Sequence, residues 1–498
     1  MESYLSGFQV VTAQRIKEIK VRAGVILQRR YELAYVQSAS TDRSLLQRVR
    51  QYGSDDVSSV PDVTFEYYHD GLKGFDQQTN WTVPGHMQFS AHQNNFDVDL
   101  GVRVVDFNGD AYPDFIKSAS YCSGGEHQVW MHNRQSTWTD TDTGWTPNLS
   151  LFGGHYMVEI CPDDWSKDNG IRLGDANGDS RVDFSQYYTV EGSGTFQGTI
   201  VRQGNTWVRD NNWNMPPYAP SSSFGTDVYY TIRSNVQPYQ HEYMGTVLAD
   251  INGDARADYV RSKDGYGRSH WSFLNKETGG WERQPSWDTA VDMNMDFADG
   301  AVLVDLNADG LMDIFYRSET ATSVHINNGS NWTVMPSSSP WHQLAGMEAD
   351  VRTTNGSTQF ADINGDGLED LIVARGNPAT GRVLINTGNG FKRDDSWIFQ
   401  STATFINSGT RLMDIDADGM TDYVQYDQFS SGAQVYVNRA VNPVDLLTAV
   451  NNGIGGRTEI EYGSSAHQDN DFLPFVVPVV KSVTASDNFS GNSYRTEY

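Results

Sequence analysis

One nine-residue unit occurs six times in this chain and restricts the folds available to it. The copy at residues 362–370 reads Asp-Ile-Asn-Gly-Asp-Gly-Leu-Glu-Asp, and the others begin at Asp106, Asp175, Asp250, Asp305 and Asp414. Each copy places oxygen-bearing side chains at positions one, three, five and nine and lies between two short apolar runs. Side chains at alternating positions of a tight loop can converge on one hard cation that takes about six to eight oxygens. The unit therefore predicts a calcium loop at the tip of a β-hairpin.

The predicted ligands are four side chains in each of six loops, numbered one to six in chain order. They are Asp106, Asn108, Asp110 and Asp114; Asp175, Asn177, Asp179 and Asp183; Asp250, Asn252, Asp254 and Asp258; Asp305, Asn307, Asp309 and Asp313; Asp362, Asn364, Asp366 and Asp370; and Asp414, Asp416, Asp418 and Asp422. Water and the carbonyl at position seven would complete the shell. No Glu stands at position twelve and no flanking helix is expected, which excludes an EF-hand.

A single copy is more simply explained as a metal-free Asp-Asn-Gly turn. Six copies that all keep the Asp at position nine favour up to six structural Ca²⁺ ions. Position six is Gly in loops four to six but Ala111, Ser180 and Ala255 in loops one to three. Gly eases the sharp turn around an ion, so the first three sites are expected to be weaker or distorted.

The chain is strongly acidic, with a formal charge of −27 over 498 residues. This charge argues against binding to nucleic acid or to anionic membrane surfaces. Much of it lies in the six loops, where carboxylates would repel one another without metal. No apolar run approaches the length of a membrane span. Cys122 and Cys161 either pair or remain as two buried thiols.

The repeats predict an all-β fold, a six-bladed β-propeller. Successive units begin 69, 75, 55, 57 and 52 residues apart, which suits several short strands per blade, with insertions in the two longest. A fourth strand in five units carries an aromatic residue: Trp138, Trp207, Trp281, Trp332 and Phe391. The sixth unit lacks one, whereas residues 79–83 closely match residues 330–334. We therefore predict that the strand at Trp81 completes the last blade and closes the ring.

Residues 1–75 and 441–498 contain no calcium unit and are rich in β-forming residues. We predict antiparallel strands in both flanks, around a propeller at residues 76–440. The first residues lack a basic stretch followed by an apolar one, so no Sec signal is visible. Either the protein leaves the cell by another route or the chain is part of something larger.

The loops resemble the VCBS/FG-GAP repeats of integrin-type propellers. The flanks, at residues 29–46, 446–462 and 473–483, resemble the B component of bacterial Tc insecticidal toxins and related SpvB-type proteins. This resemblance implies a propeller that docks onto an A-component translocation channel, and flanking strands that begin a hollow Rhs-type shell. A C component completes that shell around a cytotoxic segment. The resemblance also implies a secreted, extracellular complex, no membrane insertion by this chain and no catalysis.

The sequence contains no nucleophile elbow, Walker loop, Cys-x-x-Cys pair or His-Glu-x-x-His unit, and the segment at His241 lacks the second His. We expect His127 and His132 either to pack in the interior or to lie at the surface as ordinary polar side chains. The ADP-ribosyltransferase of some SpvB-type proteins lies in a separate domain that this chain does not contain. Two other classes stay open: a calcium-dependent adhesin or lectin, and a metal-dependent hydrolase working at the propeller channel.

Overall fold

The computed structural model describes most of the chain. The described residues are 2–3, 10–11, 14–69, 73–93, 96–121, 124–140, 144–161, 164–190, 194–204, 206–213, 231–233, 241–243, 245–263, 269–289, 291, 301–318, 321–344, 346, 351, 358–373, 382–397, 399, 409–426, 432–440, 442–467 and 476–498. Over these residues the fold is all-β, with short 3-10 helices and no α-helix. No helix in this part is long and apolar enough to cross a membrane.

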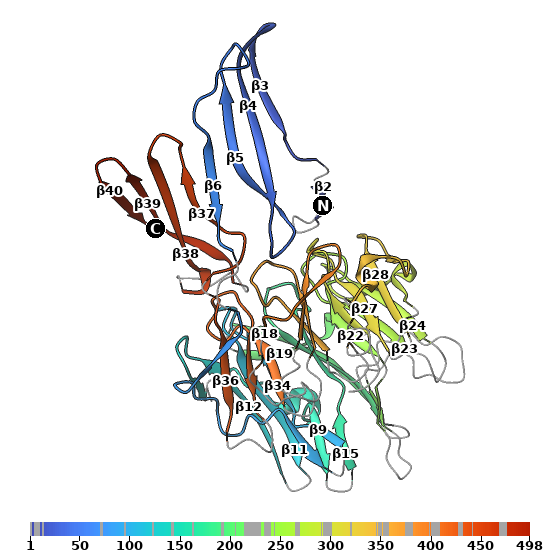
Figure 1. Ribbon diagram of the computed structural model, residues 1–498. Helices are drawn as coiled ribbons and strands as arrows, with labels where there is room; N and C mark the ends of the chain where they lie inside the picture. Colours follow the sequence, from blue (N-terminus) through green and yellow to red (C-terminus); the bar gives the residue numbers. More distant parts are fainter. Residues whose placement is uncertain are drawn as a thin grey trace.

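Six sets of four antiparallel strands form the blades of a propeller (Figure 1). Blades one to three are β10 (Val102–Val105), β11 (Asp114–Tyr121), β12 (Gly124–His132) and β13 (Trp138–Asp140); β16 (Ile171–Gly174), β17 (Asp183–Val190), β18 (Gly194–Gln203) and β19 (Thr206–Asp210); and β22 (Thr246–Ala249), β23 (Asp258–Lys263), β24 (Ser269–Asn275) and β25 (Trp281–Arg283). Blades four to six are β26 (Val302–Val304), β27 (Asp313–Arg317), β28 (Thr322–Asn327) and β29 (Trp332–Val334); β30 (Thr358–Ala361), β31 (Asp370–Val373), β32 (Arg382–Asn386) and β33 (Phe391–Asp394); and β34 (Thr410–Met413), β35 (Asp422–Gln425), β36 (Gln434–Asn438) and β7 (Phe75–Gln78). The predicted six-bladed propeller is confirmed.

The ring closes by strand exchange, but through a different strand from the predicted one. β7 pairs with β36 so that Phe75 lies opposite Asn438, just as Phe391 lies opposite Asn386 in blade five. Trp81 instead packs against Trp138 of blade one, with ring centroids 5.9 Å apart. The prediction that the Trp81 strand completes blade six is therefore wrong, because its match to residues 330–334 reflects a similar sequence and not the same register.

The propeller carries three extra hairpins, and the two that follow blades one and two account for the long spacings. β8 (Ser90–Gln93) and β9 (Phe96–Asp99) precede blade one, β14 (Val158–Cys161) and β15 (Asp164–Asp168) follow it, and β20 (Thr231–Arg233) and β21 (His241–Tyr243) follow blade two. β14 and β20 extend β11 and β17 by parallel pairing. β15 contacts both β9 and β21, so the hairpins are neighbours. The predicted insertions are confirmed. Cys122 and the side chain of Cys161 lie outside the described part.

The two flanks together form one eight-stranded antiparallel sheet. Its strands, in order, are β3 (Glu18–Ala23), β4 (Ile26–Gln37), β5 (Ser44–Tyr52), β6 (Val63–Tyr67), β37 (Leu447–Asn451), β38 (Gly456–Ser464), β39 (Pro478–Asp487) and β40 (Ser493–Glu497). The N-terminal half joins the C-terminal half where β6 pairs with β37. The remaining small sheet pairs β1 (Glu2–Ser3) with β2 (Val10–Val11). In Figure 1 the large sheet stands at one end of the propeller, and β9 and β15 lie at the other.

Aromatic side chains hold neighbouring blades together. The outer strand of a blade is followed by a short turn. An aromatic residue in this turn is buried against the aromatic residue on the outer strand of the next blade. Trp287 packs on Trp332 at 5.2 Å and Trp397 packs on Phe75 at 6.0 Å between ring centroids. The turns include η1 (Leu149–Phe152), η2 (Asn211–Trp213), η3 (Pro285–Trp287) and η4 (Pro340–His342); a further 3-10 turn, η6 (Ser465–His467), belongs to the C-terminal flank.

Candidate metal loops and docking faces

All six predicted loops join the first two strands of a blade in the same backbone conformation. Positions four and six have positive φ in every copy, such as 72° at Gly365 and 79° at Gly367 in loop five. The non-glycine residues keep this conformation, with φ of 69° at Ala111 and 66° at Ala255. A side chain in this left-handed region costs about 1–2 kcal/mol. Loops one to three thus carry this strain at position six, and loops four and six carry it at position four, where Ala308 and Ala417 have φ of 53° and 55°. The expectation that the first three sites are weaker stays a prediction.

The carboxylate at position one organises the turn. In loop five, Asp362 accepts hydrogen bonds from the backbone N–H of Asp366 at 3.1 Å and of Gly367 at 2.7 Å. Asp366 at position five accepts one from Leu368 at 2.8 Å. The other loops repeat these bonds, for example on Asp106 in loop one. These bonds place the carboxylates on the inner side of each loop, as a cation site requires.

The carboxylate at position nine lies in the protein interior and bridges the blade. Asp370 is fully buried, and it accepts hydrogen bonds from the N–H of Ile363 at 3.1 Å and of Asn386 at 2.7 Å. Asp183 in loop two accepts from Ala176 and Asn177 through one oxygen, and its other oxygen has no partner in the described part of the chain. In every loop except loop two, position nine therefore fastens the loop to the third strand.

Burial and mutual repulsion make these loops electrostatically unfavourable as free carboxylates. Burial raises the pKa of Asp258 and Asp313 from 3.8 to about 8, and the other acids of each loop push in the same direction. Burial, followed by the charges of its loop neighbours, also holds the pKa of Asp422 well above its usual range. A bound cation would remove both effects because it favours the ionised form.

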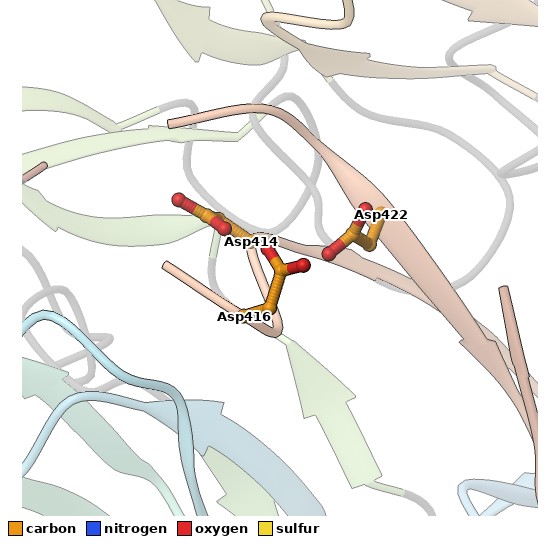
Figure 2. A group of neighbouring side chains, drawn as sticks. All are labelled: Asp414, Asp416 and Asp422. Atoms are coloured by element: carbon orange, nitrogen blue, oxygen red, sulfur yellow. The ribbon is translucent and has the colours of Figure 1, made fainter. Parts of the chain in front are cut away.

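Position three separates loop six from the others. In loops one to five an Asn amide donates to the position-five carboxylate, as Asn364 does to Asp366 at 3.3 Å. Loop six has Asp416 there, which cannot donate, and its buried Oδ1 has no hydrogen-bond partner among the described residues. Carboxylate oxygens of Asp414, Asp416 and Asp422 lie within 4.8 Å of one another, and Figure 2 shows these three side chains around a common space.

The residues present fit a divalent cation with oxygen ligands. Among the described residues the carboxylates converge in loop six, which also has a buried oxygen without a partner there, whereas the three Asp of each of loops one to five do not form such a close group. Loop one has the weakest need for metal, because Arg134 Nε already donates to Asp110 Oδ2 at 2.9 Å. Calcium itself stays a prediction that the structure makes chemically reasonable.

A set of asparagine side chains links each of blades three to six to the blade before it, a role that sequence reasoning missed. Asn386 Nδ2 donates to the carbonyl of Leu306 in loop four at 2.8 Å and to that of Glu369 at 3.1 Å. Asn275, Asn327 and Asn438 make the same pair of bonds at their own blade junctions. The recurring Asn at the end of the third strand was the available signal. His132 and Arg202 take this position in blades one and two.

The histidine residues support the expectation of a packing role. His127 places Nδ1 2.8 Å from Ser118 Oγ, but its Nε2 lies 2.7 Å from the carbonyl of Pro147 and not on a carboxylate. His132 stacks on Tyr112 with centroids 4.8 Å apart, and burial lowers its pKa to about 4. Neither imidazole has, among the described residues, the acid partner that a nucleophile–base pair uses. His241 lies in β21.

The fold and its loops define a class: a six-bladed propeller with repeated acidic loops, combined with one open sheet made from both flanks. Residues 382–498 match the family described as the insecticide toxin TcdB middle/N-terminal region. No curated protein matches the sequence. The predicted resemblance to the Tc-toxin B component is thereby confirmed, whereas the VCBS/FG-GAP and SpvB resemblances stay predictions.

Solved structures share the fold over almost the whole chain. The Tc holotoxin pore of Photorhabdus luminescens gives a TM-score of 0.59 at 17% identity, and covers 99% of this chain and 22% of that one. A TcdB2–TccC3–Cdc42 crystal structure gives 0.55 at 16% identity, and TcdB2–TccC3 gives 0.51 at 15%, each with the same coverage. At these identities the likeness establishes the fold. The chain spans about a fifth of the length of these structures.

Proposed function

We propose that this chain is a non-catalytic scaffold and docking component of a Tc-type toxin-delivery complex. Its calcium-stabilised propeller binds a channel-forming protein partner, and its eight-stranded sheet begins the wall of a toxin-enclosing shell that a C-type component completes. The complex acts outside the producing cell. The resemblance supplies the identity of these partners, and the arrangement of the two faces supplies the physical support.

The observation that supports this proposal is that the large sheet and the extra hairpins lie at opposite ends of the propeller. The pairing of β6 with β37 places both flanks together, and their hydrogen bonds reach the loop end of the propeller. β9 and β15 lie at the end away from the sheet (Figure 1), and β21 contacts β15. A partner can therefore approach the hairpins without meeting the shell wall. Loops and hairpins on a rigid ring are where binding residues usually lie.

A binding experiment tests this assignment. The full chain is immobilised and presented to a cognate A component, with residues 158–168 (β14–β15) replaced by a short Gly-Ser linker in one variant. The control shortens the β39–β40 turn in the sheet, at residues 488–491. We expect the hairpin variant to lose binding by at least tenfold, or about 1.4 kcal/mol, and the sheet variant to bind like the unmodified chain. Loss of binding only in the sheet variant would assign docking to the sheet and contradict the proposal.

A further inference from the structure

The N-terminal flank contacts the propeller at loop five. Arg43, in the turn between β4 and β5, donates from Nη1 to the carbonyl of Asp366 at 2.5 Å. On the way out of the ring, Val444 N donates to the carbonyl of Asn364 at 3.2 Å. A Cβ added at Gly365 would lie 2.8 Å from the Cβ of Pro443, so the chain covers this loop closely. Positions three, four and five of loop five are thus held from outside the propeller.

Asp445 joins the two covering segments to each other. Its carboxylate accepts a hydrogen bond from Ser38 Oγ at 2.7 Å and another from the hydroxyl of Thr41. The β4–β5 turn and the exit of the ring therefore form one hydrogen-bonded unit over loop five. Lys392 of β33 adds a bond from Nζ to the carbonyl of Ala39 at 2.8 Å.

The C-terminal flank contacts loop six in a corresponding way. Ser464, the last residue of β38, donates its hydroxyl to the carbonyl of Ala417, and His467 Nε2 lies 3.3 Å from the carbonyl of Asp416. A Cβ added at Gly419 would lie 3.4 Å from Val476 Cγ1. Positions three, four and six of loop six therefore contact the C-terminal half of the sheet.

The remaining loops do not share this arrangement. Among the described residues, the hydrogen bonds that join a flank to a metal loop fall on loops five and six. Loop one meets the C-terminal flank through apolar packing of Tyr112 in the cluster that contains Ala466. Gly178 in loop two approaches Arg256 of the next blade, and Gly253 in loop three approaches Leu311. Loops two and three therefore contact neighbouring blades, and only part of the ring supports the sheet.

The loop carbonyls that accept hydrogen bonds from the flanks belong to the predicted ligand residues or to residues between them. The carbonyls of Asn364, Asp366 and Asp416 belong to ligand residues themselves. Repulsion among the buried carboxylates of a metal-free loop would displace this backbone, because the position-one and position-five side chains that fix it repel each other. A bound cation would remove the repulsion and fix the carbonyls where the flanks meet them.

We propose that loops five and six are a metal-dependent clasp: cation binding in these two loops fixes the sheet on the propeller, and loss of the cation loosens it. Loops two to four contact neighbouring blades and leave the sheet unaffected. This inference rests on the proposed calcium binding. Because linkage is reciprocal, docking of the sheet also raises the affinity of loops five and six for the ion.

The test measures hydrogen exchange at residues 460–467 and 38–45 of the full chain, together with binding of Tb³⁺ as a luminescent probe of the loops. Asp366→Asn and Asp418→Asn change position five of the clasp loops, and Asp179→Asn makes the same change in loop two. We expect EDTA and the two clasp variants to speed exchange in the flanks about tenfold or more, within the usual range of coupling between linked sites. The Asp179 variant should leave flank exchange unchanged.

A second variant separates the clasp from the metal. Ser464→Ala removes a sheet contact and leaves all ligand side chains in place, so it should loosen the flank and, through the linkage, also weaken Tb³⁺ binding. Metal binding with equal flank exchange in all variants would overturn the clasp and leave the calcium sites standing. Absence of Tb³⁺ binding to the unmodified chain would overturn the calcium sites and the clasp together.

Discussion

Phe75 and Asn438 lie directly opposite each other in the antiparallel pair of β7 and β36, which makes the first strand of the ring the last strand of its sixth blade. Phe75 is 1% exposed and meets the ring of Tyr423 edge-on at 4.8 Å. The closure of the ring depends on this junction, because an open blade would expose a strand edge.

Truncation at the junction should weaken the whole domain. We expect Phe75→Ala to lower the free energy of unfolding by about 3–5 kcal/mol, the usual cost of removing a buried aromatic side chain. Trp81→Ala should cost less because Trp81 is half-buried against blade one. Phe489, 83% exposed in the sheet, supplies a control that should change stability by less than about 0.5 kcal/mol. Urea unfolding measures all three, and a larger loss at Trp81 than at Phe75 would contradict the closure.

Removal of calcium should lower the melting temperature, because an ion bound only by the folded state stabilises that state. At a free ion concentration one hundred times Kd, one site contributes about 2.7 kcal/mol to the free energy of unfolding. Asp366→Ala should cost more than Asp110→Ala, since loop one bears a strained Ala111 and an internal Arg134 partner. Calorimetry with and without EDTA, with elemental analysis of the purified protein, checks this. An unchanged melting curve together with no bound metal would refute it.

Acidification should stabilise the metal-free protein. Burial raises the pKa of Asp258 and Asp313 from 3.8 to about 8, so the folded state holds protons that the unfolded state has lost. Their stabilising contribution is complete below about pH 4 and is lost as the pH rises toward 8. Burial lowers the pKa of four histidines, His127, His132, His325 and His342, which act in the opposite direction but are outnumbered by the loop carboxylates with a raised pKa.

The corresponding measurement is a series of melting temperatures in EDTA at about pH 8, 7, 6 and 5, repeated with saturating calcium. We expect a rise toward the acidic end in EDTA and a smaller or reversed change with calcium, which holds the carboxylates ionised. A melting temperature that falls on acidification in EDTA would show that these carboxylates do not control stability.

The strain of the left-handed backbone at position six should change the stability of variants in which Gly and Ala are interchanged there. Ala111→Gly and Ala255→Gly should each stabilise the protein by about 0.5–1 kcal/mol, the left-handed strain less the entropy of an added glycine. Gly367→Ala should cost about 1 kcal/mol. No atom lies within 4 Å of a Cβ at Gly367, so this cost would come from the backbone alone. Denaturant midpoints compare the three, and a stabilising Gly367→Ala would exclude the strain argument.

Loss of an interblade asparagine should destabilise the ring more than loss of a surface one. Asn386 is fully buried and holds two carbonyls, so Asn386→Ala should cost about 2 kcal/mol or more by leaving buried acceptors unpaired. The matched control is Asn331→Ala, at an exposed position in the turn before β29, which should change stability by less than about 0.5 kcal/mol. Chemical denaturation compares the two variants, and equal effects would show that the bridging bonds contribute little.

Much of the architecture could be predicted from the sequence because its signals are local. The six acidic units, the short apolar runs beside them and the outer-strand aromatics each lie within one blade. The hairpin at β37 and β38 likewise follows from residues close together in the chain. These patterns define blade number and the candidate ligands without knowledge of any distant contact.

The relationships that were missed join residues far apart. The partner of the Asn386 amide lies 80 residues earlier, and Arg43 meets loop five across 323 residues. The closing strand was misassigned because residues 79–83 match an outer strand in sequence, whereas the pairing partner is chosen by three-dimensional register. The pair Gly74 and Phe75, which resembles Gly390 and Phe391, was the better signal.

The exchange of β7 into blade six also sets an order of events during synthesis. β7 leaves the ribosome early, but its partner β36 is made only after the five intervening blades. At ~5–20 residues per second this delay is roughly 20–70 s. Throughout that time the nascent ring has an unpaired edge at each end, and β6 similarly waits for β37. The protein therefore completes blade six and the eight-stranded sheet only when translation has passed the last blade, so its final tertiary structure forms late.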